Sequence, residues 1–258
     1  MKILIIRNTV SFNPFIYLLL LAGLLLAPDL SFSGDWRVAP IRLEFGKGAK
    51  TGAITVYNEG AEKLTVQMKA MEWTQDAEGK DQYAETSDII FFPKIMVLEK
   101  NEEKIIRAGI RIPAVAKEKT YRLFIEEIPE PKKKEGANIA VAIRFGVPVF
   151  AKPLREEPRG EIEKIGMAKG VLSAVVRNIG NVHFRISSIA VTEKDAKGNI
   201  IFSKDLDGWY LLNGVSRTYT TEIPKDKCVE GSKLELNVKS DNLNITKSLN
   251  IEKSMCLP

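Results

Sequence analysis

The sequence predicts an all-β protein built from two β-sandwich domains that are joined by a short elbow. Three observations support this fold class. Beyond residue 33, apolar and polar residues alternate with a period of two over many short stretches. Turn-forming residues separate these stretches, and no later run of about 12 residues or more has the apolar spacing of an amphipathic helix. A charged, proline-containing stretch divides the alternating region into two parts of similar length.

Residues 1–33 are expected to be a cleavable secretory signal peptide rather than part of the fold. Lys2 and Arg7 give a positive start, an apolar run covers residues 14–27, and small residues precede an expected cut ahead of Gly34. The run is about 14 residues long, which is too short to span a membrane comfortably. An uncleaved N-terminal anchor is the alternative. Because no later stretch is long and apolar enough to span a membrane, the mature protein is expected to be soluble and exported.

The first domain is expected over residues 34–153. Its alternation is clearest in three stretches: Leu64, Val66, Met68 and Ala70; Ile106, Ala108, Ile110 and Ile112; and Tyr121, Leu123 and Ile125. Turn signals at residues 58–60 and 77–79 and at Pro113 separate them. A strand with apolar side chains at alternate positions buries one face, so these stretches predict the strands of a sandwich.

The predicted elbow is residues 152–158, Lys-Pro-Leu-Arg-Glu-Glu-Pro, because its prolines and charges make a stiff, polar connector. The second domain is expected over residues 154–258, with strands near 172–176, 186–191, 200–202 and 234–238. Residues 195–199 predict a hairpin turn in which Gly198 or Asn199 takes a positive φ. Each half has about 100–120 residues, the usual size of an immunoglobulin-like sandwich.

The composition argues against an enzyme. Thirty-eight Lys and Arg stand against 33 Asp and Glu, a net charge of +5 with the signs interspersed, so no nucleic-acid partner is indicated. One histidine and two cysteines make a multi-ligand zinc site or a Ser-His-Asp hydrolase hard to build. We therefore expect no catalytic residue, no metal and no cofactor, and we interpret the single histidine, His183, as structural.

Residues 138–153 form the unusual segment of the first half. Alternation places Ile139, Val141 and Ile143 on one face of the expected strand and Ala140, Ala142 and Arg144 on the other. A core strand is the ordinary explanation of this pattern. However, the segment is the last strand before the elbow, and Pro148 suits a sheet edge because proline cannot donate to a ladder. An apolar edge strand in a soluble protein favours a partner that adds its own strand.

Several motifs resemble a known family. The motifs of the first domain are VAPIRL at 38–43, TYRLFIEEIP at 120–129 and FGVPVFAKP at 145–153, and weaker ones in the second are NIGNVH at 178–183 and GWYLL at 208–212. Together they resemble the PapD-like periplasmic chaperones of chaperone–usher pili, over essentially the whole mature chain. One departure from the family's pattern, at Pro148, indicates a divergent branch.

The resemblance implies donor-strand complementation. Such chaperones bind pilus or fimbrial subunits, which are incomplete sandwiches that lack their last strand, and insert an edge strand into the gap. Matched to that motif, Ile139, Val141 and Ile143 are the donor residues. Each fully buried aliphatic side chain contributes roughly 1.5–3 kcal/mol of transfer free energy. A slip of one residue would present the opposite face of the strand and lose nearly all of this.

The resemblance also implies a clamp for the carboxylate at the subunit's C-terminus. Arg42 matches the family's first-strand arginine, whose planar guanidinium can bond a carboxylate through two N–H groups; a solvated strand residue is the alternative. The usual second clamp residue is a lysine on the last strand, where this chain has Pro148. The basic partner is therefore expected elsewhere, with Arg122 or Arg144 as candidates, although Arg122 could equally be an ordinary surface arginine.

Cys228 and Cys256 are an even pair late in an exported chain, which predicts a disulfide. The bond would close a loop of about 29 residues and contribute roughly 3–4 kcal/mol by the chain-entropy argument. A catalytic role for Cys228 is disfavoured.

The leading hypothesis is a periplasmic chaperone that binds and stabilises pilus subunits and delivers them to an outer-membrane usher. No nucleotide is expected, since folding of the subunit onto a neighbour's strand can drive release. Self-association through the edge strand is a further possibility for the free protein. The alternative is an exported two-domain adhesion or ligand-binding module that shares only the fold. The apolar triplet distinguishes the two, because such a module has no need to expose it.

Overall fold

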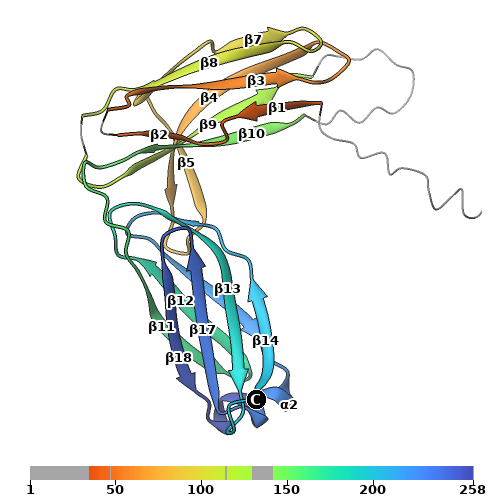
Figure 1. Cartoon of the computed structure of the whole chain (residues 1–258), viewed down its shortest axis with the longest axis vertical. Coiled ribbons are helices and arrows are strands. Elements are labelled where there is room, and N and C mark those ends of the chain that lie inside the picture. Colours follow the sequence, from red (N-terminus) through yellow and green to blue (C-terminus); the bar gives the residue numbers. More distant parts are fainter. Residues whose placement is uncertain (1–34, 47, 114, 130–141, 258) are drawn as a thin grey trace, which may run out of the picture. The chain divides into compact units, whose positions relative to one another are not determined.

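The computed structural model describes residues 35–46, 48–113, 115–129 and 142–257. Nearly all regular structure in these residues is β-strand, and the strands form two sandwiches, one from β1 to β10 and one from β11 to β18 (Figure 1). The prediction of an all-β fold with two immunoglobulin-like sandwiches is confirmed. The helices found in the described ranges are short, and none has the length and apolar character needed to cross a membrane.

The N-terminal sandwich consists of two sheets with one apolar core between them. The first sheet has the order β1 (Trp36–Ala39), β3 (Thr51–Asn58), β8 (Glu103–Ile110) and β6 (Ile89–Phe92). The second has the order β2 (Leu43–Phe45), β10 (Arg144–Ala151), β9 (Lys119–Glu127), β4 (Leu64–Gln75) and β5 (Asp81–Glu85), and β7 (Ile95–Leu98) also pairs with β4. Neighbouring strands are antiparallel except β2 and β10, which are parallel.

The C-terminal sandwich is also formed by two sheets. One has the order β11 (Gly160–Ala168), β12 (Val171–Asn178) and β16 (Ser216–Glu222). The other has the order β14 (Ile200–Leu206), β13 (Phe184–Lys194), β17 (Lys233–Ser240) and β18 (Asn244–Asn250), and β15 (Tyr210–Leu211) pairs with β13. A short helix, α2 (Lys225–Glu230), and a 3₁₀ turn, η1 (Lys253–Cys256), are joined by a disulfide between Cys228 and Cys256.

The alternation in the sequence corresponds to burial in the strands. In β4, Leu64, Val66 and Met68 are buried and the residues between them are more exposed. The same holds in β9, where Tyr121, Leu123 and Ile125 are completely buried. The predicted hairpin turn connects β13 to β14, and Gly198 adopts φ = 86° there, a conformation that glycine takes without a steric penalty.

The strand β10 is partly an edge strand. It pairs with β9 along its whole length, whereas β2 covers only its last residues, Val149–Ala151. On the β2 side, Arg144–Pro148 therefore have no strand partner within the described residues. Pro148 stands at the end of this open stretch, which is where a residue without an N–H is tolerated in a sheet.

A partly buried cluster at the start of β9 is expected to make the stability of the fold depend on pH. Asp88 accepts hydrogen bonds from Tyr121 Oη at 2.7 Å and from Lys119 Nζ at 2.9 Å. The bonds from Lys119 and Tyr121 outweigh the effect of burial and lower the pKa of Asp88. A carboxylate with a lowered pKa in the folded state stabilises the fold above its unfolded pKa, and this contribution disappears as the pH falls through the folded pKa.

We expect the variant Asp88→Asn to be less stable than the wild type at neutral pH, and the difference to shrink below about pH 4. Urea unfolding of both proteins between about pH 2 and 7 measures it. Asp205→Asn is a suitable control because Asp205 is exposed on β14. A difference between Asp88→Asn and wild type that is constant over this range would contradict the assignment.

Candidate functional site

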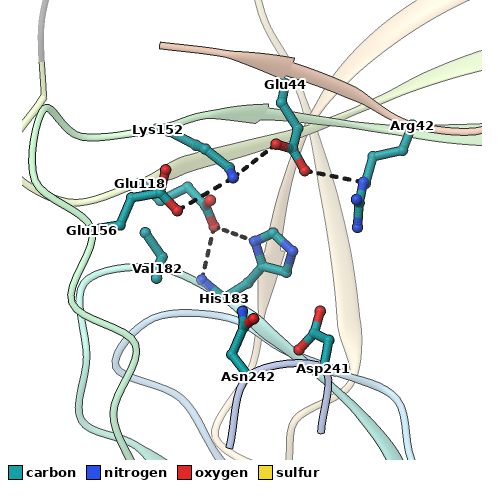
Figure 2. Close-up of a pocket in the computed structure, with 9 residues that line it drawn as sticks. All are labelled: Arg42, Glu44, Glu118, Lys152, Glu156, Val182, His183, Asp241 and Asn242. Carbon is teal, nitrogen blue, oxygen red and sulfur yellow. Dashed lines mark hydrogen bonds and ion pairs between the residues drawn. The ribbon is translucent and has the colours of Figure 1, made fainter. Parts of the chain in front are cut away.

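A polar cavity of about 350 Å³ lies where loops of both sandwiches meet, and it contains the predicted Arg42 (Figure 2). The N-terminal sandwich contributes Arg42 and Glu44 at β2, Glu118 before β9, and Lys152 and Glu156 after β10. The C-terminal sandwich contributes Val182 and His183 before β13, and Asp241 and Asn242 from the turn between β17 and β18. Charged side chains therefore dominate the lining.

Glu44 connects the two cations of the cavity. Its Oε1 is 3.1 Å from Arg42 Nε, and its Oε2 is 2.7 Å from Lys152 Nζ (Figure 2). Lys152 Nζ is also 3.3 Å from Glu156 Oε2. Burial alone would raise the pKa of Glu44, but the hydrogen bond from Lys152 and the charges of Lys152 and Arg42 outweigh burial and lower it. Burial would lower the pKa of Lys152, but its hydrogen bonds and charge interactions with Glu44 and Glu156 outweigh burial and raise it.

Parallel pairing of β2 with β10 produces this arrangement. Glu44 is opposite Phe150 in the ladder, so the outward-facing side chain of Glu44 lies near the end of β10, where Lys152 follows. The strand β2 alternates buried Leu43 and Phe45 with exposed Glu44, which directs the glutamate away from the core.

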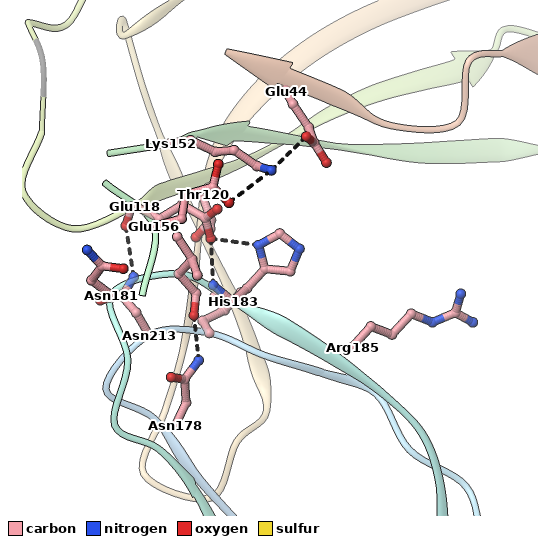
Figure 3. A network of polar contacts seen from close by, with 12 residues as sticks. Glu44, Glu118, Thr120, Lys152, Glu156, Asn178, Asn181, His183, Arg185 and Asn213 are labelled. Atoms are coloured by element: carbon pink, nitrogen blue, oxygen red, sulfur yellow. Dashed lines mark hydrogen bonds and ion pairs between the residues drawn. The ribbon is translucent and has the colours of Figure 1, made fainter. Parts of the chain in front are cut away.

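Glu118 and His183 form the buried floor of the cavity and link the two sandwiches. Glu118 Oε1 accepts a hydrogen bond from the backbone N–H of His183 at 2.9 Å and lies 2.7 Å from His183 Nδ1 (Figure 3). The Glu118 side chain is fully buried, and the His183 ring stacks on Phe150 with 3.7 Å between centroids. This supports the interpretation of His183 as a structural residue.

The loop that carries His183 is fixed by two asparagines. Asn178 is completely buried and donates to the carbonyls of Val182 and Leu211, both at 2.9 Å. Asn181 donates to Arg155 O at 2.8 Å and accepts from the N–H of Glu157 at 2.7 Å. The loop is thereby tied to both its own sandwich and the connecting segment, which gives the cavity a rigid floor.

The predicted arginines are not brought together. Arg42 lines the cavity, with its side chain about half exposed. The side chain of Arg122 is only 11% exposed; its guanidinium carbon lies 4.2 Å from the ring centroid of Trp73 and 5.7 Å from that of Trp209. Arg144 is exposed, 3.8 Å from the ring centroid of Phe124. Neither Arg122 nor Arg144 lines the cavity with Arg42.

Lys152 is the basic residue that sequence reasoning missed. The sequence predicts that it belongs to the elbow, yet the structure places its ammonium group on the same carboxylate as Arg42. The local signal was its position immediately after an apolar strand. The pairing of β2 with β10, which brings Lys152 to Glu44, has no signature within either segment.

The predicted donor segment is only partly described. Ile139 and Val141 lie outside the described residues. Ile143 is half-buried against the core of the N-terminal sandwich, and it is joined to Glu127 by a backbone bond at 3.0 Å and by a bond from its N–H to Glu127 Oε2 at 3.3 Å. No cluster of His, Cys, Asp and Glu suited to a metal ion occurs in the part of the chain that the structure describes.

Comparison with known proteins agrees with this architecture. A family model described as "Pili and flagellar-assembly chaperone, PapD N-terminal domain" matches residues 36–155. No curated protein matches the sequence significantly.

Solved structures of pilus chaperones share the fold. A chain of the CsuC–CsuE chaperone–tip adhesion subunit pre-assembly complex from the archaic chaperone-usher Csu pili of Acinetobacter baumannii is 19% identical, with a TM-score of 0.58, covering 82% of this chain and 98% of its own. The Pseudomonas aeruginosa CupB2 chaperone is 12% identical, with a TM-score of 0.52 and coverages of 84% and 100%. The E. coli chaperone DraB is 15% identical, with a TM-score of 0.50 and coverages of 84% and 95%.

These likenesses extend over both sandwiches, and at such identities they are evidence of fold. The family match adds the evidence from sequence. Pilus-assembly chaperones of this family act in the periplasm and are not enzymes. Residues 36–155 therefore match the N-terminal domain of the PapD-like pili-assembly chaperones, and the chain has the fold of the solved pilus chaperones.

Proposed function

We propose that this protein is a periplasmic chaperone that binds pilus or fimbrial subunits by donor-strand complementation and delivers them to an outer-membrane usher. The observation that carries the proposal is the PapD N-terminal match over residues 36–155, which includes the alternating segment 139–143. In this proposal residues 1–33 direct export and are removed, leaving domains at 34–153 and 154–258.

The described residues support an open edge of β10 to which a strand of the subunit can add. Ile143 precedes β10 directly, and the stretch Arg144–Pro148 has free ladder positions on the β2 side within the described ranges. A strand added there would gain backbone hydrogen bonds from the edge and apolar contacts from alternate side chains. Ile139, Val141 and Ile143 would enter the subunit's groove, with Ile143 exchanging its contact with the chaperone's own core for one with the subunit. The same edge could pair two free chaperones.

Arg42 and Lys152 are the pair that we propose for the subunit's C-terminal carboxylate. Both already contact one carboxylate, that of Glu44, from its two oxygens. An arginine fork and an ammonium group can hold an incoming carboxylate in the same manner. Arg122 is enclosed by two tryptophans, and Arg144 lies on the ring of Phe124, so they suit a structural role better.

The donor residues can be tested by co-purification from the periplasm of a strain that expresses candidate subunits. We expect the wild type to retain a near-stoichiometric small β-rich protein and the variant Ile139→Asp/Val141→Asp to lose it, because two charges would have to enter an apolar groove. The mass of the purified chaperone also shows whether residues 1–33 are removed.

The matched control is Ala140→Asp/Ala142→Asp, which places the same charges on the opposite face of the same segment. This variant should retain the partner. Equal recovery with all three proteins would show that binding uses another surface. Recovery of no partner by the wild type would favour an adhesion or ligand-binding module instead.

A further inference from the structure

Glu44 occupies the place that a bound carboxylate would take. One of its oxygens meets Arg42 Nε at 3.1 Å, and the other meets Lys152 Nζ at 2.7 Å. The side chain is about one-third exposed at the wall of the cavity, so it can rotate toward solvent without opening the core. The cations thus have an internal carboxylate that is held in position but can be displaced.

We propose that Glu44 is an intramolecular placeholder that occupies the carboxylate site of the free chaperone and is displaced by the C-terminal carboxylate of a subunit. The proposal rests on the function proposed above, because it concerns regulation of that same site. In the free protein, Glu44 neutralises Arg42 and Lys152; in the complex, the subunit's chain end takes over both contacts.

The charges around the cavity give the placeholder a physical role. Four carboxylates, those of Glu44, Glu118, Glu156 and Asp241, line it with only two permanent cations, Arg42 and Lys152. A small anion entering this cavity meets cations that are already paired and further carboxylates nearby, so repulsion disfavours it. A chain end that is also anchored by a donor strand arrives at high effective concentration and can compete with Glu44.

Occupation of Arg42 and Lys152 by Glu44 weakens the binding of free carboxylates to the site. When the competent form of a site is only a fraction of the population, the apparent dissociation constant rises by the inverse of that fraction. If Glu44 holds the two cations about nine-tenths of the time, free carboxylates bind about tenfold more weakly than the bare cations would allow. The same factor applies to a subunit, but it is a smaller share of a binding free energy to which the donor strand also contributes.

The test is a titration of the purified full-length chaperone with N-acetylglycine, a minimal C-terminal carboxylate, at constant ionic strength. N-acetylglycinamide serves as the uncharged probe. Binding is followed by NMR through the Arg42 Nε–Hε signal and the backbone amides of residues 42–44. We expect Glu44→Gln to bind N-acetylglycine about tenfold more tightly than the wild type, with no gain for the amide.

Two further variants define the origin of the gain. Glu156→Gln removes a carboxylate that contacts Lys152 alone, at 3.3 Å, and is expected to change the affinity much less. Adding Arg42→Gln to Glu44→Gln should abolish the gain. A gain that persists without Arg42 would be a general charge effect and would overturn the proposal. Backbone spectra of each variant verify that it is folded.

The remaining outcomes separate this inference from the proposed function. If Glu44→Gln and the wild type bind N-acetylglycine equally and Arg42→Gln abolishes binding in both, the placeholder is excluded and the carboxylate site stands. If none of the folded variants binds the probe, both the placeholder and the carboxylate site are excluded. The donor strand is judged independently, by the co-purification experiment.

Discussion

Replacing Glu118 by alanine is expected to destabilise the protein by about 3 kcal/mol, because it leaves a buried hydrogen-bond donor unsatisfied, which costs about 1–3 kcal/mol, and also creates a cavity. The Glu118 side chain is completely buried, and its Oε1 holds both the N–H and the ring of His183. Removing the carboxylate leaves the N–H of His183 buried without that acceptor and a cavity beside the Phe150 stack. The free energy of unfolding from urea denaturation measures this loss.

Two comparisons make the result specific. Glu118→Gln keeps an oxygen that can accept from the N–H of His183, so it should lose less stability than Glu118→Ala. Glu156→Ala removes a half-exposed carboxylate of the same cavity and should cost less than about 1 kcal/mol. Equal stabilities for Glu118→Ala and Glu156→Ala would show that the buried link contributes no more than a surface ion pair.

The same residues show what the sequence alone can and cannot predict. The strands of both sandwiches were predictable because burial on one face of a strand imposes an alternation that is local in the sequence. Glu118 precedes β9, outside the alternating stretch, and nothing near it identifies His183 as its partner. A contact between two domains depends on how their loops meet, which no local period encodes.

The residues of the carboxylate site were likewise only partly predictable from the sequence. A motif on the first strand identified Arg42, whereas its neighbour Lys152 is found only when β2 and β10 are paired in parallel. Arg122 lies outside the apolar alternation of its strand, which equally predicts an ordinary surface arginine, yet its side chain is only 11% exposed. Its guanidinium packs on Trp73 from its own sheet and near Trp209 from the other sandwich. The donor residues Ile139 and Val141 stay a prediction.

Replacing both disulfide cysteines by alanine is expected to lower the free energy of unfolding by about 3–4 kcal/mol. Cys228 and Cys256 are both buried and are 28 residues apart in the sequence, so their bond restricts a loop of intermediate length in the unfolded chain. They connect the six-residue α2 to η1. A helix of that length has little stability of its own, so the end of the C-terminal sandwich depends on this connection. The double variant and the wild type are compared by urea unfolding.

Reduction of the wild type provides the matched control, because it breaks the same bond without removing sulfur from the contact between Cys228 Sγ and Met167 Sδ. Reduced wild type and the double variant should therefore unfold at similar urea concentrations, and the oxidised wild type at a higher one.

The cavity at Arg42 contains neither cysteine. N-acetylglycine binding to the folded double variant should thus equal that of the wild type. An unchanged urea midpoint would contradict the expected stabilisation, and weaker binding with the fold intact would show that the disulfide acts on the site itself.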